Sequence, residues 1–143
     1  MRLRRLVTPF AYAWAFFPGT LIGLVCVLLA LASGGRCRLV RGCLEVHGGL
    51  VTRLLRHGVF LAGGASAMTL GHVILGQDEC CLRRTREHER VHVRQYERWG
   101  PLFLPAYFAS SLWEWLRGRH AYLDNRFEVE AYSTTSTLKD SSP

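Results

Sequence analysis

Two histidines and a glutamate form the most informative chemical group in this chain, within His-Glu-Arg-Val-His at residues 88–92. An α-helix has about 3.6 residues per turn, so His88 and His92 lie one turn apart on one face and can bind the same metal ion. Glu89 projects beside them and can take a proton from a water that the ion activates. The pattern therefore predicts a metal-dependent hydrolytic site in which Glu89 is the general base.

The helix that carries this group is expected over residues 82–99, which contain no Gly or Pro and are followed by Gly100-Pro101. Residues 68–75, just before it, are expected to form a strand, which in the simplest case is an edge strand that covers the helix. Residues 37–47 alternate between apolar and polar types, which predicts a strand or hairpin with Gly48-Gly49 as its turn.

A third ligand is needed, because a catalytic zinc ion takes three protein ligands and leaves one position open. Glu128 is a candidate, in a helix expected over residues 124–132 after the turn-prone Arg117-Gly118-Arg119. Asn125 and Glu128 also have the spacing of a helix capping box. Glu128 can therefore serve its own helix terminus or bind the metal, and the spacing does not choose between these uses.

On these residues the chain resembles the gluzincins, zinc metallopeptidases with H-E-x-x-H on one helix and E-x-x-A-D on a later one. Residues 88–92 match the first part, and Glu-Val-Glu-Ala at 128–131 matches E-x-x-A. The resemblance implies that Glu128, rather than Glu130, is the third ligand to Zn²⁺ and that the substrate is a peptide or protein. The stretch 68–132, roughly the last half of the chain, also looks like a group of small, uncharacterised bacterial membrane proteins with this zincin core.

Tyr132 departs from the family pattern, which has Asp at this position. That Asp commonly orients a zinc-binding histidine, so here the role is left to Asp124, Glu130 or a backbone carbonyl. Tyr132 and His120 are candidates for the group that stabilises the oxyanion of the substrate.

The N-terminal part is strongly apolar, and residues 7–33 contain no charged residue. This is longer than the roughly 20 residues that cross a bilayer. Arginines border it on both sides: Arg2, Arg4, Arg5, Arg36, Arg38 and Arg41. We predict an N-terminal membrane helix that anchors the chain, over residues 1–33, with a kink at Pro18-Gly19. A cleaved signal peptide around residues 21–32 is the alternative, and a buried core helix is disfavoured because so small a domain has little interior.

With a length of 143 residues, the rest of the chain is expected to be one α+β domain over residues 34–132. Its core would be a minimal zincin-like one, with short strands, the active-site helix and the glutamate-bearing helix. Residues 101–116 are apolar but short, which predicts a helix that packs on the core or lies in the membrane interface. Residues 133–143 are polar and are expected to be a disordered tail.

The net charge of +7 comes from 17 Arg and one Lys. Without a nucleic-acid-binding motif, these arginines indicate contacts with anionic membrane lipids rather than with nucleic acid. The five cysteines are an odd number and include no C-x-x-C pair, which argues against a disulfide framework. Together with slightly more arginines after the apolar segment than before it, this favours a cytoplasmic domain.

Two functions follow from these patterns. The first is a membrane-associated zinc metallopeptidase that hydrolyses peptide bonds. The alternative is a membrane-anchored, non-catalytic binding or regulatory protein in which the metal site is structural or vestigial. Replacing Glu89 by glutamine separates them, because only an enzyme would lose turnover while it keeps its metal.

Overall fold

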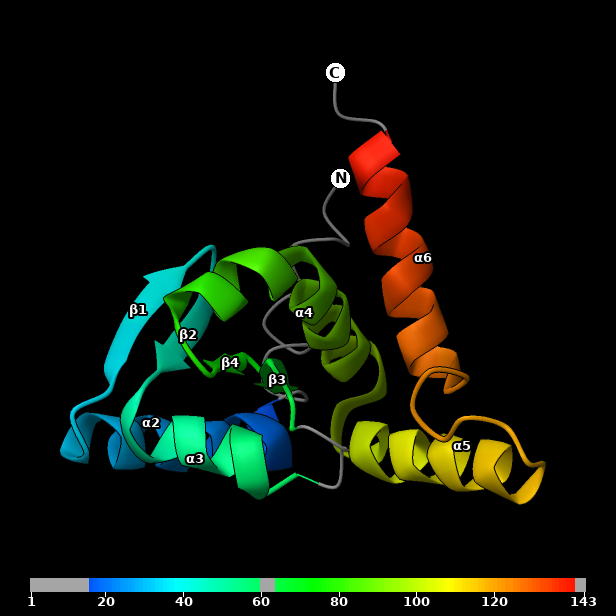
Figure 1. Cartoon of the computed structure of the whole chain (residues 1–143), viewed down its shortest axis with the longest axis horizontal. Coiled ribbons are helices and arrows are strands. Elements are labelled where there is room, and N and C mark those ends of the chain that lie inside the picture. The colour runs from blue at the N-terminus through cyan, green and yellow to red at the C-terminus, as the bar shows by residue number, and fades with distance from the viewer. Residues whose placement is uncertain (1–15, 60–63, 141–143) are drawn as a thin grey trace, which may run out of the picture.

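The computed structural model describes residues 16–59 and 64–140 (Figure 1). Its centre is a four-stranded mixed sheet in the order β1-β2-β4-β3, formed by β1 (Arg36–Val40), β2 (Cys43–His47), β3 (Ala67–Leu70) and β4 (Val73–Gly76). Helices α2 (Leu21–Ala32) and α3 (Gly49–His57) pack on one face of the sheet, and α4 (Glu79–Trp99) packs on the other. Beyond α4 lie α5 (Phe103–Leu116) and α6 (Arg126–Asp140). The architecture is α+β.

Two tight turns set the register of the sheet. Arg41 and Gly42 connect β1 to β2 with φ of 49° and 83°, the left-handed conformation that a two-residue hairpin turn requires. Gly71, at φ 62°, turns β3 into β4. The single strand predicted over residues 68–75 is therefore wrong, because this glycine folds the stretch into a hairpin. The hairpin turn predicted at Gly48-Gly49 is also wrong, since these residues lead from β2 into α3 and the hairpin turns at Arg41-Gly42.

The N-terminal membrane helix predicted over residues 1–33 is not found. Within the described ranges 16–59 and 64–140, no helix is long and apolar enough to cross a membrane. The apolar run is interrupted within the short η1 (Phe16–Thr20), which contains Pro18-Gly19 and has non-helical backbone angles at Phe17, and α2 follows it directly. Helix α2 has 12 residues, so its length is about 18 Å, against a hydrocarbon core of about 30 Å. It buries one side against the sheet and α3, through Cys26, Val27 and Ala30.

α2 therefore packs one side on the protein core and leaves its other side exposed, so it is not a fully buried core helix either. The sheet provides enough apolar surface for one side of this helix, so the domain does not need an interior that surrounds it. Residues 1–15, the first part of the predicted anchor, lie outside the described residues.

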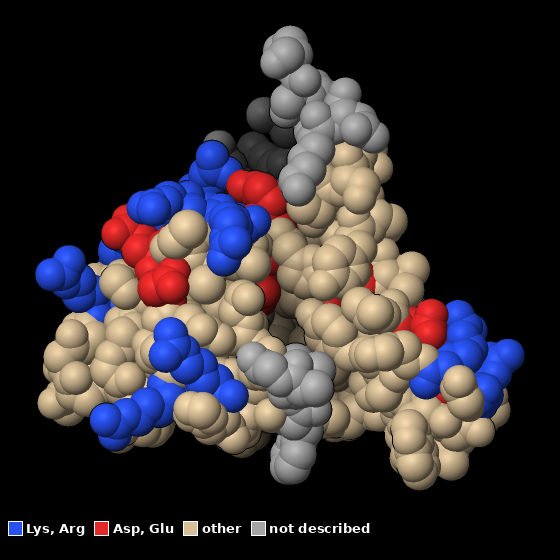
Figure 2. All heavy atoms as spheres, viewed as in Figure 1, with Lys and Arg blue, Asp and Glu red and all other residues tan. Residues whose placement is uncertain are grey.

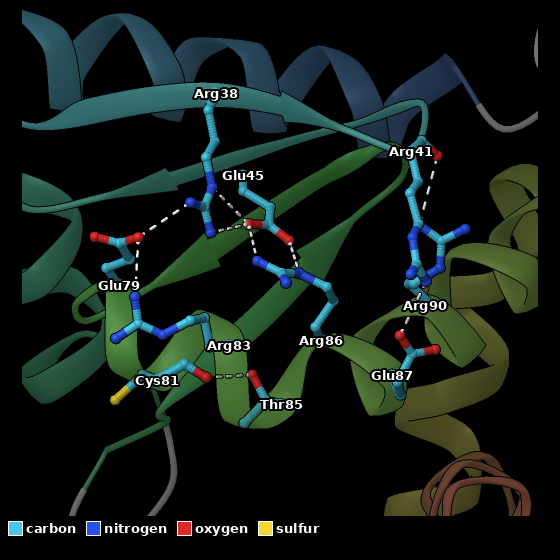
Figure 3. Close-up of polar contacts among 10 residues, drawn as sticks. All are labelled: Arg38, Arg41, Glu45, Glu79, Cys81, Arg83, Thr85, Arg86, Glu87 and Arg90. Atoms are coloured by element: carbon cyan, nitrogen blue, oxygen red, sulfur yellow. Dashed lines mark hydrogen bonds and ion pairs between the residues drawn. The ribbon is translucent and has the colours of Figure 1, made fainter. Parts of the chain in front are cut away.

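A buried carboxylate fastens the N-terminal half of α4 to the sheet (Figure 3). Glu45 on β2 has a side chain only 1 % exposed. It accepts two hydrogen bonds from Arg86 of α4, at 2.6 and 3.0 Å, and two from Arg38 of β1, at 3.1 and 3.0 Å. Burial raises the pKa of Glu45, but the hydrogen bonds and charges of the two arginines outweigh it and hold that pKa below its usual range. Two strands and a helix are thus joined at one ionised group.

The C-terminal half of α4 packs on α5 and α6 through an aromatic cluster. Tyr96, Phe103 and Phe127 are its buried members, one from each helix, and Trp99 and Tyr107 pack around them. The short η2 (Gly100–Leu102) turns the chain from α4 into α5. Helix α6 continues to Asp140, through most of the segment expected to be a disordered tail. Its hydroxyl side chains bond to carbonyls four residues earlier, as Thr135 does to Ala131 at 2.7 Å, which keeps them compatible with a helix.

Candidate metal centre

Helix α4 brings His88 and His92 together, as their spacing predicts. Asp78 begins the helix by accepting the backbone N–H of Cys81 at 2.7 Å, and the 21-residue helix runs without a break to Gly100. The Nε2 atoms of the two rings are 3.2 Å apart. Both side chains are mostly buried, at 12 % and 9 % exposed.

Helix α6 directs Glu128 at the two imidazoles. Asn125 caps this helix by accepting the backbone N–H of Phe127 at 3.0 Å, and it is itself fixed by hydrogen bonds to α5. Glu128 is therefore free for another use, and its oxygens lie 3.1 Å from His88 Nε2 and 3.3 Å from His92 Nε2. Glu128 therefore does not cap its own helix and lies beside the histidines, where it could bind a metal.

The carboxylate of Glu128 is ionised and incompletely satisfied. Its Oε1 accepts a hydrogen bond from the Tyr107 hydroxyl at 2.6 Å. Its Oε2 faces His88, but among the described residues no donor is aligned with it, so this buried oxygen has no hydrogen bond. Burial raises the pKa of Glu128, yet its contacts with the two histidines outweigh burial and hold that pKa far below its usual range. A buried anionic oxygen without a donor is the kind of group that a cation stabilises.

Gln95 determines which nitrogen of His92 carries the proton. The Gln95 amide nitrogen donates to the Phe127 carbonyl at 3.0 Å and to Glu130 at 2.9 Å, and both partners are acceptors. The amide oxygen therefore faces His92 Nδ1, 2.8 Å away, and accepts a hydrogen bond from its N–H. Neutral His92 then presents the lone pair of Nε2 to the centre, which is the tautomer that binds a metal. Glu130 is one of the residues proposed to orient a zinc-binding histidine, and it holds Gln95, which in turn orients His92.

Glu89 lies beside this group, on the side of strand β3. Its side chain is buried, and its Oε2 accepts a hydrogen bond of 2.7 Å from the Thr69 hydroxyl. Burial raises the pKa of Glu89 above its usual value, and the nearby His92 and His88 offset this only in part. A carboxylate fixed by one donor, with a raised pKa, is suited to accept and return a proton.

Of the other candidate residues, Tyr132 contacts the metal-ligand cluster, whereas His120 and Asp124 do not. The Tyr132 ring lies 4.6 Å from the His88 ring, centroid to centroid. His120 is exposed, and its Nδ1 accepts the backbone N–H groups of Tyr122 and Leu123 in the turn before α6. Asp124 closes the same turn by accepting the backbone N–H of His120 at 2.8 Å. Both residues stabilise this turn.

Three residues that the sequence analysis missed contact the centre: Thr69, Gln95 and Tyr107. Gln95 is three residues after His92 on the same helix face, so its contact with His92 could have been predicted from the spacing. Thr69 and Tyr107 depend on how β3 and α5 pack, and no local pattern reveals that.

These groups are arranged so that they can hold a cation. His88, His92 and Glu128 each offer one atom, and the three atoms lie within 4.8 Å of one another. When both imidazoles are neutral and protonated on Nδ1, their Nε2 lone pairs and a Glu128 oxygen face one another, and a cation between them would stabilise this arrangement. Figure 2 shows a hollow in this face of the molecule, between the half that contains α4 and the half that contains α6, with acidic atoms in its wall.

Comparison of the chain with protein family models, with curated proteins and with solved structures found no match.

Proposed function

We propose that this protein is a zinc-dependent metallopeptidase with His88, His92 and Glu128 as metal ligands and Glu89 as general base. One observation carries the proposal: two histidines and an ionised glutamate from two helices converge on one point, with a second carboxylate beside them. A purely structural ion would not require that second carboxylate.

Zinc is the metal that this set of ligand types favours. A tetrahedral zinc ion with bonds of about 2.0–2.1 Å separates its ligand atoms by about 3.3 Å. The two Nε2 atoms are 3.2 Å apart and His88 Nε2 is 3.1 Å from Glu128 Oε2, both close to this value, whereas the 3.3 Å contact of His92 Nε2 is with the other oxygen, Oε1. Two imidazoles and one carboxylate are also the ligand set of a known class of catalytic zinc sites. Bound between these residues, a zinc ion would supply Lewis acidity and would lower the pKa of a water toward about 7.

The residues of this chain then have separate tasks. Glu89 accepts the proton of the attacking water and returns it to the leaving amine, while Thr69 keeps its carboxylate in place. Gln95 holds His92 in the binding tautomer. Tyr107 fixes one oxygen of Glu128 and leaves the other directed at His88.

The first test is the zinc content of the purified full-length chain. We expect about one zinc per chain, as three protein ligands imply, and loss of zinc in His88→Ala and in Glu128→Ala. His57→Ala is the matched control, because His57 is an exposed histidine on α3, away from the centre. Wild-type protein that stays free of zinc after remetallation would contradict the proposal.

The second test concerns catalysis. Glu89→Gln should keep zinc and the fold but lose hydrolysis of a mixed peptide library by about 10²–10⁴-fold, the usual contribution of a general base. If neither the wild type nor this variant cleaves peptides while both bind zinc, the metal has a structural or regulatory role and the enzymatic proposal fails.

A further inference from the structure

The exposed apolar side chains of this protein are concentrated on two helices. On α2, Leu21, Val25 and Leu28 are 40 %, 55 % and 67 % exposed. On α5, Phe108, Leu112 and Trp115 are 64 %, 55 % and 64 % exposed. Each set has the spacing i, i+4, i+7, so each forms one stripe along its helix. We call these six residues the α2–α5 face.

Both stripes point away from the body of the molecule. On α2, the buried residues Val27 and Ala30 occupy the opposite side of the helix and pack on the sheet. On α5, Phe103 and Tyr107 face the aromatic cluster, opposite the exposed stripe. The segments that precede the two helices, η1 and η2, contact each other. From that junction α2 and α5 run in opposite directions along the lower edge of Figure 1.

Arginines without acidic partners border this face. Arg53 and Arg56 on α3, and Arg117 at the end of α5, are exposed and make no ion pair with any residue in 16–59 or 64–140. Figure 2 shows basic atoms over α3 and at the far end of α5, and the described residues along the lower edge between them are mostly uncharged. Arg117 also lies over the ring of Trp113, which is 60 % exposed. An apolar strip with tryptophan and a basic border matches the interface of an anionic bilayer.

We propose that the α2–α5 face docks the protein onto the surface of an anionic lipid bilayer, within one leaflet. At 12 and 14 residues, α2 and α5 are too short to span but have a suitable length to lie in the interface plane. A twofold dimer through this face fits less well, since it would bring the same unpaired arginines toward each other. The inference does not rest on the metal centre, although α5 contributes both Phe108 to the face and Tyr107 to the centre.

The test is flotation of the purified full-length chain with vesicles. Vesicles of equal parts phosphatidylcholine and phosphatidylglycerol should bind the protein, and phosphatidylcholine alone should bind it less. The double variant Leu112→Ser/Trp115→Ser should reduce binding at least about tenfold, because burial of one large apolar side chain already changes a partition constant by that order. Leu39→Ser is the matched control: Leu39 is 71 % exposed, but lies on β1 outside the face.

A second pair of variants tests the contribution of the arginines to membrane binding. Arg53→Ala should lower binding to the anionic vesicles about fivefold, the effect of roughly 1 kcal/mol per basic residue near a charged bilayer. Arg94→Ala removes an exposed arginine on α4, across the sheet from α3, and should leave binding unchanged. High salt should weaken the wild type and abolish the difference, because screening shortens the range of these charges.

Two results would overturn the inference. One is that the wild-type protein does not bind anionic vesicles, or that the Leu112→Ser/Trp115→Ser variant binds them as well as the wild type does. The other is a dimer in vesicle-free buffer that the same substitutions turn into monomers, which would assign the face to a second copy. Glu89→Gln should float like the wild type, so failure of the enzymatic proposal and failure of this one remain distinguishable. Circular dichroism confirms that each variant is folded.

Discussion

Replacing Gln95 by methionine should weaken zinc binding without removing any ligand. Methionine has a similar size and no polar group, so it keeps the packing of this side chain, which is only 1 % exposed. The substitution deletes three hydrogen bonds: to His92 at 2.8 Å, to the Phe127 carbonyl at 3.0 Å and to Glu130 at 2.9 Å. The His92 ring is then free to place its proton on Nε2, where it blocks the metal.

The magnitude follows from what each lost contact does. Loss of a group that orients a metal-binding histidine typically costs about 10–100-fold in metal affinity, or roughly 1.4–2.8 kcal/mol. Three hydrogen bonds at about 1 kcal/mol each also lower the free energy of unfolding by about 3 kcal/mol. The zinc Kd, measured by competition with a chelator, should therefore rise by one to two orders of magnitude, with the protein still folded.

Glu45→Gln is the control for this experiment, because it removes a buried polar contact between the sheet and α4 that does not touch the metal centre. It should lower the free energy of unfolding by a similar amount and leave the zinc Kd unchanged. The visible spectrum of the cobalt-loaded protein gives an independent measure of the ligand geometry, which should change only in Gln95→Met. An unchanged Kd and an unchanged spectrum in that variant would refute the role assigned to the Gln95 amide.

Three further outcomes can be checked on the same protein. Glu45→Gln leaves Arg86 and Arg38 without their charged partner, so the free energy of unfolding measured in urea should fall by about 3 kcal/mol. This value is at the lower end of the range for broken buried ion pairs, because both arginines are partly exposed. Since the folded-state pKa of Glu45 is lowered, its contribution is present above the unfolded-state pKa and is lost as pH falls through the folded-state pKa. Wild-type stability should therefore decrease on the acid side more steeply than that of Glu45→Gln. Thr69→Val should keep the zinc content and lower kcat about tenfold or more, because Glu89 loses the donor that orients it; an unchanged kcat would contradict that role.

The sequence alone predicts the part of the site that local geometry controls. His88, Glu89 and His92 share one uninterrupted helix, so the 3.6-residue period is enough to place them. The assignment of Glu128 as the third ligand rested on the resemblance to a family, because its distance from the histidines depends on how α6 packs on α4. Its alternative role at the helix terminus was resolved by Asn125, which caps α6 by itself.

The N-terminal segment shows why composition misled the prediction of a membrane helix. An uncharged run predicts burial in an apolar medium but does not identify the medium. Here α2 gives one side to the sheet, through residues such as Val27, and leaves the other side, through residues such as Leu28, exposed. A helix that is apolar on all sides can pack on a protein core or on a membrane. Only the tertiary structure shows that one side of α2 packs on the protein core.

The metal centre should also act as a link between two parts of the fold. His88 and His92 belong to α4, which Glu45 ties to the sheet, whereas Glu128 belongs to α6, which is held by the aromatic cluster and by the Arg98–Glu130 ion pair at 2.8 Å. A metal that binds only the folded arrangement stabilises it by about 2.7 kcal/mol when its free concentration is a hundred times Kd. Chelation should therefore speed hydrogen exchange most in α6 and least in the sheet. Uniform acceleration would show that α6 and the sheet unfold as one unit, and that the metal is not a separate link between them.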